Sequence, residues 1–369
     1  MKNSSYLNNK SVLVTGGTGT FGRAFIKRLF EHYEPREVVV FSRDEFKQFE
    51  MGQTFSPSRY PVRYFIGDIR DRERLLRAFN GIDVVVHAAA LKQVPALEAN
   101  PMEAIKTNII GAQNIIEAAL DRNVKRVIGI STDKAVSPTN LYGATKLAME
   151  KLLVAANTYT RYRDVRFNVV RYGNVKGSRG SVIPFWSDLV RRGETALPIT
   201  DPRMTRFLID LEEGIDLVVR AVDQAEPGEI LVPKIPSIRM IDLLKAFPGS
   251  PQPRIVGVRP GEKVHEVLIS EDEGRHTYDL GSHFVILPEF DERRAQRRAV
   301  KIGRAMPEGF TYSSENNDTW LEHEELSEMI HDLGDFGNAV ATVPRAVQTN
   351  PSHLHQAVLR ASPIKAMSR

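Results

Sequence analysis

Residues 12–25 read VLVTGGTGTFGRAF, an apolar β-branched run that breaks into Gly16, Gly19 and Gly22 before an apolar-periodic segment. Glycines at this spacing permit a tight turn and a close backbone approach, and the free N–H groups at the start of a helix attract a pyrophosphate. Because the glycines close a strand and open a helix, the stretch predicts a dinucleotide-binding loop rather than a merely tight turn. The loop residues expected to bind the cofactor are Gly16, Thr18, Gly19, Thr20, Phe21 and Gly22.

Further apolar, β-branched runs follow along the first half of the chain. The expected strands are Ser11–Thr15, Glu37–Phe41, Val62–Gly67, Val84–His87, Val127–Ser131 and Phe167–Arg171. Segments with helical spacing separate them, namely Gly22–Tyr33, Arg72–Asn80, Met102–Arg122 and Tyr142–Thr158. Strands that alternate with helices indicate βαβ units and a parallel sheet covered on both faces. The expected fold class is therefore α/β, a Rossmann-type doubly wound parallel sheet with a smaller C-terminal substrate-binding lobe.

The pattern changes after Pro184, where prolines punctuate shorter elements. We expect residues 7–185 to form the sheet domain, to which residues 210–225 return as a helix. Residues 186–209 and 226–333 are expected to form the substrate-binding lobe and C-terminal elements. Residues 334–369 lack a clear period and are rich in Ala, Pro, Ser, Gln and Asn, which is typical of a flexible tail.

The composition indicates an ordinary globular protein, with 42% hydrophobic and 26% charged residues. There is no Cys, which excludes disulfides and thiolate metal sites and fits a reducing cytoplasm. The net charge of +4 comes from residues 336–369, which hold four basic and no acidic residues and leave 46 of each sign elsewhere. No basic patch interleaved with aromatics is present, so no nucleic-acid partner is expected. The sequence shows no secretory signal and no span of ~18 apolar residues. We therefore expect a cytoplasmic protein that is not associated with a membrane.

The residues after the second and third strands decide between the two nicotinamide dinucleotides. An acid after the second strand accepts hydrogen bonds from a ribose 2′-OH, whereas basic or hydroxyl residues favour a 2′-phosphate. Ser42 and Arg43 precede Asp44, so NADP is favoured, while Asp44 is the argument for NAD. Asp68 follows the third strand, where it either borders the adenine or caps a helix. The residues expected at this end are Ser42, Arg43, Asp44, Lys47, Asp68 and Ile69.

Residues 131–146, STDKAVSPTNLYGATK, gather four proton-handling groups after the fifth strand. Tyr142 and Lys146 are four residues apart and so share one helical face. A nearby ammonium and a nicotinamide cation both favour a phenolate, which lets a tyrosine take a proton from a sugar hydroxyl. Asp133 and Lys134 sit at the carboxyl end of a central strand, where open α/β sheets bind ligands. A surface salt bridge is the alternative for this pair.

The glycine loop together with Tyr142-x-x-x-Lys146 resembles the extended short-chain dehydrogenase/reductase superfamily. More narrowly, the chain resembles the inverting UDP-N-acetylglucosamine 4,6-dehydratases of bacterial pseudaminic acid and surface-glycan synthesis. The stretches that carry this resemblance span about Leu7 to Glu322 and read GGTGTFG, FSRDEFKQFEM, HAAALKQVP, STDKA, NLYGATK, RYGNVKGSRGSVIPF, LPITDPRMTRF and VRPGEKVHE.

This resemblance implies a reaction in which oxidation at C4 of the sugar acidifies the C5 proton, water is lost across C5 and C6, and a hydride returns to C6. Tyr142 would act at the C4 hydroxyl, Lys134 as the C5 base and Asp133 as the acid at O6, while Thr132 would hydrogen-bond the C4 oxygen. A proton delivered to the opposite face inverts C5. Lys134 must be neutral to act as a base, so we expect burial or nearby positive charge to lower its pKa.

The resemblance also implies which other residues bind the two ligands, and a homo-oligomer, either a hexamer or a dimer. The further residues implied at the cofactor are Ala88, Lys92, Ser131, Tyr142, Lys146 and Val175. The residues expected at a UDP-sugar are Lys92, Lys134, Asn174, Arg179, Gly180, Ser181, Val182, Arg206, Arg259 and Glu262. The arginines are expected because a nucleotide sugar brings a diphosphate that needs cations, although a surface ion pair is the alternative for any one of them.

Two other functions remain open from the sequence. A retaining nucleotide-sugar dehydratase would carry Asp-Glu where this chain has Asp133-Lys134, and a C4 epimerase would have no such pair because it loses no water. A cofactor-sensing regulatory protein without catalysis is the third reading, but an intact Tyr142 and Lys146 argue against it.

Overall fold

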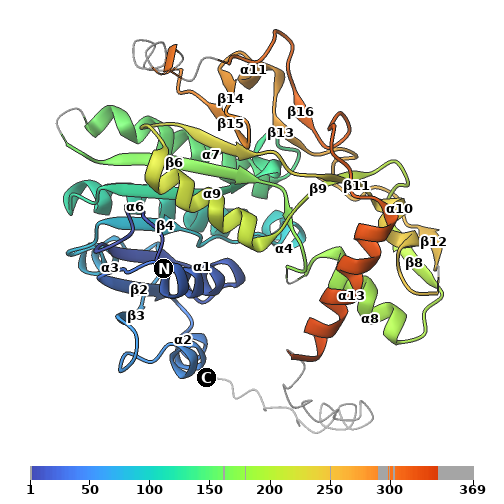
Figure 1. The fold of residues 1–369 in the computed structure, drawn as a ribbon, viewed down its shortest axis with the longest axis horizontal. Helices are drawn as coiled ribbons and strands as arrows, with labels where there is room; N and C mark the ends of the chain where they lie inside the picture. Colours follow the sequence, from blue (N-terminus) through green and yellow to red (C-terminus); the bar gives the residue numbers. More distant parts are fainter. Residues whose placement is uncertain are drawn as a thin grey trace, which may run out of the picture.

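The computed structural model describes residues 2–160, 163–178, 180–249, 251–289, 298, 300, 301 and 304–339, with the backbone alone for residues 334–339. Within this part of the chain, one large sheet is flanked by helices, and smaller elements gather at one end of it (Figure 1).

The large sheet has nine strands among the described residues, in the order β14-β15-β10-β6-β5-β4-β1-β2-β3. The strands are β1 Ser11–Thr15, β2 Glu37–Ser42, β3 Val62–Ile66, β4 Val84–His87, β5 Arg126–Thr132, β6 Arg166–Tyr172, β10 Ile230–Pro233, β14 Thr277–Asp279 and β15 His283–Ile286. Those from β1 to β6 pair in parallel, β10 joins β6 in parallel, and β15 and β14 run antiparallel at one edge. The six predicted strands are confirmed, as is the α/β fold class, and the strand order reverses between β1 and β4.

Helices cover both faces of this sheet. One layer contains α1 (Thr20–His32) packed beside α9 (Leu211–Gln224), and the other contains α3 (Arg72–Ala78), α6 (Gly111–Asp121) and α7 (Leu141–Ala156) side by side (Figure 1). Helix α2 spans Glu45–Thr54, which we did not predict because its outward face carries Phe46 and Phe49 and its hydrophobic pattern is weak. The two layers place the carboxyl ends of the strands at one open edge.

The predicted helix Met102–Arg122 is not one continuous α-helix. The segment begins as α5 (Pro101–Ala104), passes through a π-helical turn at Ile105–Ile110 and continues as α6. The π turn carries Asn108, whose side-chain amide exchanges two hydrogen bonds of 2.9 Å with the backbone of Leu91 and donates to Thr145 Oγ1 at 3.0 Å. A π turn is short and rare, so the prediction of a single helix over this segment did not anticipate it.

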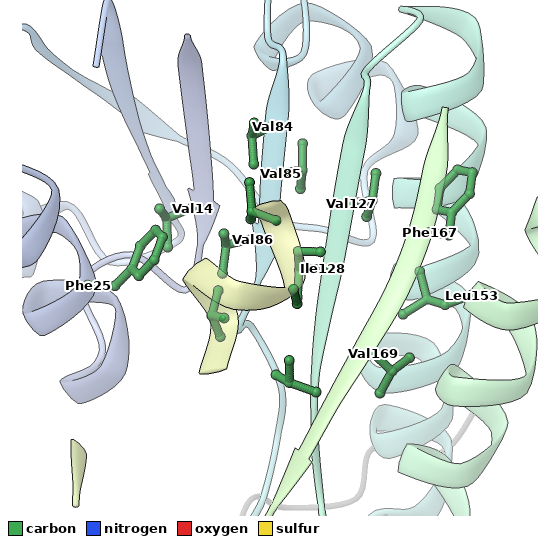
Figure 2. Close-up of a cluster of buried hydrophobic side chains, with 14 of the residues drawn as sticks. Val14, Phe25, Val84, Val85, Val86, Val127, Ile128, Leu153, Phe167 and Val169 are labelled. Carbon is green, nitrogen blue, oxygen red and sulfur yellow. The ribbon is translucent and has the colours of Figure 1, made fainter. Parts of the chain in front are cut away.

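The core lies where the central strands meet the two helical layers. Val14, Val85 and Ile128 are completely buried on adjacent strands, and Phe25 of α1 and Leu153 of α7 close over them from opposite sides (Figure 2). These strands are buried on both faces, so they read as continuous apolar runs rather than as alternating patterns. Burial on both faces is what made β1, β4 and β5 predictable.

A second hydrophobic cluster holds the smaller lobe together, with Trp186, Leu243 and Leu326 at its centre. The elements of the lobe and its links to the sheet are α4 Val94–Ala99, β7 Asn174–Val175, α8 Val182–Arg191, β8 Ala196–Ile199, β9 Thr205–Ile209, β11 Ser237–Arg239, α10 Met240–Lys245, β12 Gln252–Ile255, β13 Val267–Ile269, α11 Glu271–Gly274, β16 Tyr312–Ser313 and α13 His323–Ala339. Figure 1 shows α8, α10 and α13 grouped beyond the end of the large sheet.

The proposed division of the chain needs two adjustments. Within residues 226–333, which we assigned to the smaller lobe, β10, β14 and β15 belong to the large sheet, because their short apolar runs complete its edge. Residues 334–339, which we assigned to a flexible tail, continue α13, and residues 340–369 lie outside the described part. None of the helices within the described residues is both long and apolar enough to cross a membrane.

Candidate functional site

Two cavities lie along the carboxyl ends of the strands, and they share Gly16, Gly19, Ala88 and Ala90. The first is lined by predicted adenosine-end and loop residues, namely Gly16, Thr18, Gly19, Ser42, Arg43, Asp44, Lys47, Asp68, Ile69 and Ala88. The second is lined by predicted residues from both ligand groups, namely Gly16, Gly19, Thr20, Phe21, Gly22, Ala88, Lys92, Ser131, Thr132, Lys134, Tyr142, Lys146, Asn174, Val175, Gly180 and Ser181. The two cavities therefore form one continuous groove across the point where the strand order reverses.

The glycine loop has the geometry that a pyrophosphate needs. Gly16 has a φ of +67°, and a Cβ on it would meet the backbone nitrogen of Ala89 at 2.9 Å. A Cβ on Gly22 would lie 2.6 Å from the backbone of Gly17, so the loop packs directly on the first turn of α1. The N-cap of α1 is Gly19, with no side-chain cap and no acidic residue in the first turn. Its N–H groups and helix dipole therefore remain available to an anion.

After β2, the exposed Arg43 lies beside Asp44, whose carboxylate is already bound within the protein. Asp44 caps α2 by accepting from the Lys47 backbone N–H at 3.0 Å, and its other oxygen pairs with the Lys47 ammonium. Arg43 is about half exposed, and its guanidinium lies 3.6 Å from a carboxylate oxygen of Asp68. Asp68 is bound more closely by Arg70, at 2.7 Å. Both Arg43 and Asp44 line the cavity, but the Asp44 carboxylate is already bound by Lys47, whereas the Arg43 guanidinium is half exposed.

Asp133 and Lys134 form an ion pair at the end of β5, in which the aspartate is buried and the lysine is partly exposed. The Lys134 Nζ donates to Asp133 Oδ1 at 3.0 Å and to Asn174 Oδ1 at 3.4 Å, and Thr132 Oγ1 donates to the same Asp133 oxygen at 2.8 Å. Asp133 is fully buried, and its Oδ2 has no hydrogen-bond partner among the described residues. Lys134 lines the second cavity while Asp133 lies beneath it. The pair is therefore not the surface salt bridge that was the alternative.

The expected lowering of the Lys134 pKa is wrong for this structure. Burial alone lowers the pKa of a lysine, but the carboxylates of Asp133 and Glu266 outweigh burial and raise the Lys134 pKa above its usual range. Burial in turn raises the Asp133 pKa, against the pull of Lys134. The pKa values of both partners are thus raised, and the proton lies on Lys134 in the resting pair.

Tyr142 and Lys146 lie in the same cavity but do not interact as expected. Burial raises the pKa of Tyr142 to about 12, and the cation that opposes this is Lys134 rather than Lys146. The Lys146 ammonium donates to the Ile130 carbonyl oxygen at 2.5 Å and contacts Met149 Sδ at 3.1 Å. Burial lowers the pKa of Lys146 to about 8. Sequence spacing placed both side chains on one helix face, but it could not show which cation affects the phenol.

Close packing of α7 on the turn after β5 sets the distance between these groups. The N-cap of α7 is Asn140, whose Oδ1 accepts from the Gly143 N–H at 2.8 Å and whose Nδ2 donates to the Gly261 carbonyl at 2.8 Å. A Cβ on Gly143 would lie 2.1 Å from the Lys134 carbonyl oxygen. The backbone that carries Lys134 therefore touches the first turn of the helix that carries Tyr142, and only glycine permits this approach.

We expect Gly143→Ala to lower activity about 10²-fold, because displacing α7 by even ~1 Å separates Tyr142 from the turn at Lys134. Overpacking should also reduce the free energy of unfolding by about 1–3 kcal/mol. Initial rates and urea unfolding measure the two effects. Gly214→Ala in α9 is the matched control, since a Cβ there meets its nearest neighbour at an ordinary 3.8 Å. Equal behaviour of the two variants would contradict this role of Gly143.

The predicted substrate residues divide into three groups. Five of them line the second cavity, namely Lys92, Lys134, Asn174, Gly180 and Ser181, and the buried Ser181 hydroxyl has no partner among the described residues. Four line neither cavity: Val182, which opens α8 beside the second cavity, Arg206, Arg259 and Glu262. Arg179 lies outside the described part of the chain.

Arg206 is committed to the protein itself. Its guanidinium donates to the backbone carbonyls of Thr205 at 2.7 Å and of Val264 and Lys263 at 3.0 Å. It also lies 3.5 Å from a Glu262 oxygen. Arg259 is exposed in the loop between β12 and β13. Arg206 therefore fits an internal role better than the diphosphate contact we expected, which leaves Arg259 as the described arginine open to an anion at this end.

Sequence reasoning missed several residues at the site. Glu266 lies 3.4 Å from the Lys134 ammonium, Tyr172 lines the second cavity, and the buried Thr107 hydroxyl lines the first without a partner among the described residues. Glu266 lies in the stretch VRPGEKVHE, which carries part of the resemblance, but its position beside Lys134 depends on tertiary structure. Within the described residues there is no cluster of His, Asp and Glu suited to a metal ion.

Comparison with known proteins places this site in context. A family model described as polysaccharide biosynthesis protein matches residues 12–288. An inverting UDP-N-acetylglucosamine 4,6-dehydratase of Campylobacter jejuni is 48% identical over 334 residues, which cover 89% of this chain and 99% of that protein. A UDP-glucose 4-epimerase of Rickettsia canadensis is 41% identical over 285 residues, which cover 75% and 83% respectively.

Solved structures agree on the architecture. Pen from Bacillus thuringiensis is similar with a TM-score of 0.80 and 35% identity, covering 89% of this chain and 98% of that one. The dTDP-glucose 4,6-dehydratase DesIV of Streptomyces venezuelae, solved with NAD and TYD bound, has a TM-score of 0.61 and 23% identity over 79% of this chain and 96% of its own. This second likeness concerns the fold alone. The chain belongs to the polysaccharide biosynthesis protein family and to the same family as the inverting UDP-N-acetylglucosamine 4,6-dehydratases of Campylobacter jejuni.

Proposed function

We propose that this protein is a hydro-lyase that converts UDP-N-acetylglucosamine into UDP-2-acetamido-2,6-dideoxy-β-L-arabino-hex-4-ulose, with inversion at C5. The observation that carries this proposal is the Asp133–Lys134 pair, hydrogen-bonded at 3.0 Å, whose lysine lines the cavity that also holds Tyr142 and whose buried aspartate lies beneath that cavity. An acid and a base beside an oxidising centre are what loss of water requires. The 48% identity to relatives named for this reaction supports the same substrate.

A nicotinamide dinucleotide fits the groove. The open N-terminus of α1, the close glycine contacts and the unpartnered hydroxyls of Thr107 and Ser131 suit a bound diphosphate, adenosine and nicotinamide ribose. When bound, the nicotinamide supplies the hydride chemistry, accepting a hydride from C4 and returning one to C6. We propose NADP, because Asp44 is engaged in capping α2 while Arg43 remains half exposed at the cavity.

The residues then divide the proton transfers between them. Tyr142 removes the proton of the C4 hydroxyl as C4 is oxidised, with Thr132 beside it to hydrogen-bond the C4 oxygen. Transfer of one proton from Lys134 Nζ to Asp133 Oδ1 turns the ion pair into a neutral amine and a carboxylic acid. Lys134 then takes the C5 proton, Asp133 gives its proton to O6, and water leaves. Both residues return to their ionised forms. C5 then takes a solvent proton on its opposite face, which inverts C5, and Tyr142 releases to solvent the proton that it took from the C4 hydroxyl.

Arg43→Ala should weaken NADP binding and leave NAD binding unchanged, because only NADP carries the 2′-phosphate. Hydrogen bonds to charged groups are worth ~1.5–3 kcal/mol, or about 10- to 150-fold in the dissociation constant. Calorimetric titration of both cofactors measures this difference. Arg36→Ala, at the opposite end of β2, is the control and should alter neither affinity. If Arg43→Ala weakens both cofactors equally, Arg43 does not read the 2′-phosphate.

The function is tested by incubating the protein and NADP with UDP-N-acetylglucosamine in deuterated water and following the product by NMR. We expect loss of the 6-hydroxyl, deuterium at C5 and the inverted C5 configuration. The Rickettsia relatives named as UDP-glucose 4-epimerases make C4 epimerisation the second candidate. A product that keeps its 6-hydroxyl with C4 inverted would support the epimerase, and one that keeps the C5 configuration would support a retaining dehydratase. The homo-oligomer implied by the resemblance and the cytoplasmic location expected from the composition stay predictions.

A further inference from the structure

A third charged residue, Glu266, lies beside the Asp133–Lys134 pair and comes from a distant segment of the chain. Glu266 precedes β13 and is almost fully buried, with Oε1 3.4 Å from the Lys134 ammonium. The Lys134 side chain therefore lies between two carboxylates, one before it in the sequence and one brought in by the smaller lobe. Burying a carboxylate is expensive unless it is paired, and Glu266 Oε2 has no hydrogen-bond partner among the described residues. A buried carboxylate left half-satisfied beside a catalytic amine calls for an explanation.

The protein holds Glu266 in place with several independent contacts. Its backbone N–H donates to Ser314 Oγ at 2.9 Å, and the Ser314 N–H donates to its carbonyl at 2.8 Å. Ser314 Oγ in turn contacts Thr205 Oγ1 at 2.7 Å. Arg206, fixed by three backbone carbonyls, lies 3.8 Å from Glu266 Oε1. Arg206 thus supports Glu266, which explains an arginine that lines neither cavity.

We propose that Glu266 is a positioning residue for the elimination: its carboxylate orients the Lys134 amine toward the sugar and stabilises the positive charge that this amine gains when it accepts the C5 proton. The proposal deepens the dehydratase function above and rests on it. A preorganised charge aimed at a group where charge develops is an effective form of catalytic support. Glu266 touches neither cavity, so it acts through Lys134.

The charged and titratable groups that face Lys134 come from four parts of the fold and give the proposal a measurable sign. Asp133 follows β5, Lys263 and Glu266 precede β13, Arg206 lies on β9, and Tyr142 lies on α7. Asp133 and Glu266 both raise the Lys134 pKa, and Arg206 opposes them. Replacing Glu266 by a neutral residue removes one of the two anions, so the Lys134 pKa must fall.

The test is Glu266→Gln, which keeps the size of the side chain and removes its charge. In wild-type protein labelled with [ε-¹³C]lysine, the Lys134 resonance, assigned with Lys134→Met, should titrate only at strongly alkaline pH. In Glu266→Gln its midpoint should fall by about 1–3 pH units. Glu266→Asp, which keeps the charge, should restore most of the shift. This measurement needs no turnover, so it stands even if the proposed reaction fails.

A kinetic measurement distinguishes a loss of Lys134 positioning from a general loss of folding or activity. With UDP-N-acetylglucosamine, Glu266→Gln should slow C5 deuterium incorporation by about 10²-fold, because the positive charge that Lys134 gains is no longer balanced, while formation of reduced nicotinamide from C4 oxidation changes by less than about twofold. Glu229→Gln is the matched control, since Glu229 is an equally buried glutamate that pairs with Arg298 at 2.7 Å and lines neither cavity, so the Lys134 midpoint and the rate of C5 exchange should stay unchanged. An unmoved Lys134 midpoint in Glu266→Gln, or an equal shift in Glu229→Gln, overturns the proposal.

Discussion

Lys134→Ala should abolish C5 proton exchange and loss of water while it leaves cofactor binding intact. A positioned general base contributes about 10²–10⁴-fold, so we expect a loss of that size in the rate of 4-keto-6-deoxy product formation. Tyr142 and Lys146 remain in place, and the glycine loop is remote from the substitution. Oxidation at C4 should therefore continue, and reduced nicotinamide should still form. The experiment measures C5 deuterium by NMR, reduced nicotinamide by absorbance, and cofactor affinity by calorimetry.

Two further variants make the Lys134 result interpretable. Lys134→Met preserves most of the side-chain volume and should give the same kinetic loss, which excludes a packing effect. Lys245→Ala removes an exposed lysine of α10 that pairs with Asp242, and should behave as wild type. If Lys134→Ala loses cofactor binding and C5 exchange to the same degree, Lys134 is structural and the assignment of the base is wrong.

Arg171→Ala should destabilise the whole protein by about 3–5 kcal/mol, because it leaves two carboxylates without their cation. Arg171 on β6 is completely buried, and its guanidinium bonds both oxygens of Glu150 on α7, at 3.0 and 2.6 Å. It also bonds both oxygens of Glu273 on α11, at 2.8 and 3.0 Å, and the Leu268 carbonyl at 2.9 Å. Urea unfolding monitored by circular dichroism measures the loss.

The control for this prediction is a surface arginine. Arg192→Ala, at the end of α8, removes an exposed pair with Asp188 and should cost less than about 1 kcal/mol. A double variant, Arg171→Met with Glu150→Leu, should recover part of the loss, since removing both members of a buried pair avoids the unpaired charge. An Arg171→Ala midpoint equal to that of the Arg192→Ala control would show that the network contributes nothing to stability.

The first half of the fold was predictable because each central strand is buried on both faces. Val84–His87 has no polar residue before its last position, and β4 occupies the predicted residues without change. Helix Leu211–Gln224 begins and ends as its apolar spacing indicates. By contrast, β10, β14 and β15 are short runs among prolines, and their membership of the large sheet depends on pairing with strands far away in the sequence.

The residues that form the site could be predicted from the sequence, but the pKa values of those residues could not. Lys134, Tyr142 and Asn174 lie together as expected, because their strand and helix ends meet at one edge. The protonation of Lys134 could not be predicted, since it depends on Glu266, which tertiary structure brings in from 132 positions along the chain. The role of Arg206 was missed for the same reason, because its partners are backbone carbonyls that leave no sequence signal.

The parallel pairing of β6 with β10 has a consequence for how the chain reaches this structure. Val169 lies opposite Ile230, and α8, β8, β9 and α9 all fall between them in the sequence. Closing a loop of that length costs chain entropy before any contact rewards it, and such non-local pairings form slowly. Strands β1, β2 and β3 pair in sequence order through shorter connections, so we expect these pairings to form early. The pairing of β1 with β4 also spans a long stretch of chain, since Val12 lies opposite Val84, so we expect the groove at this strand-order reversal to form after the local pairings.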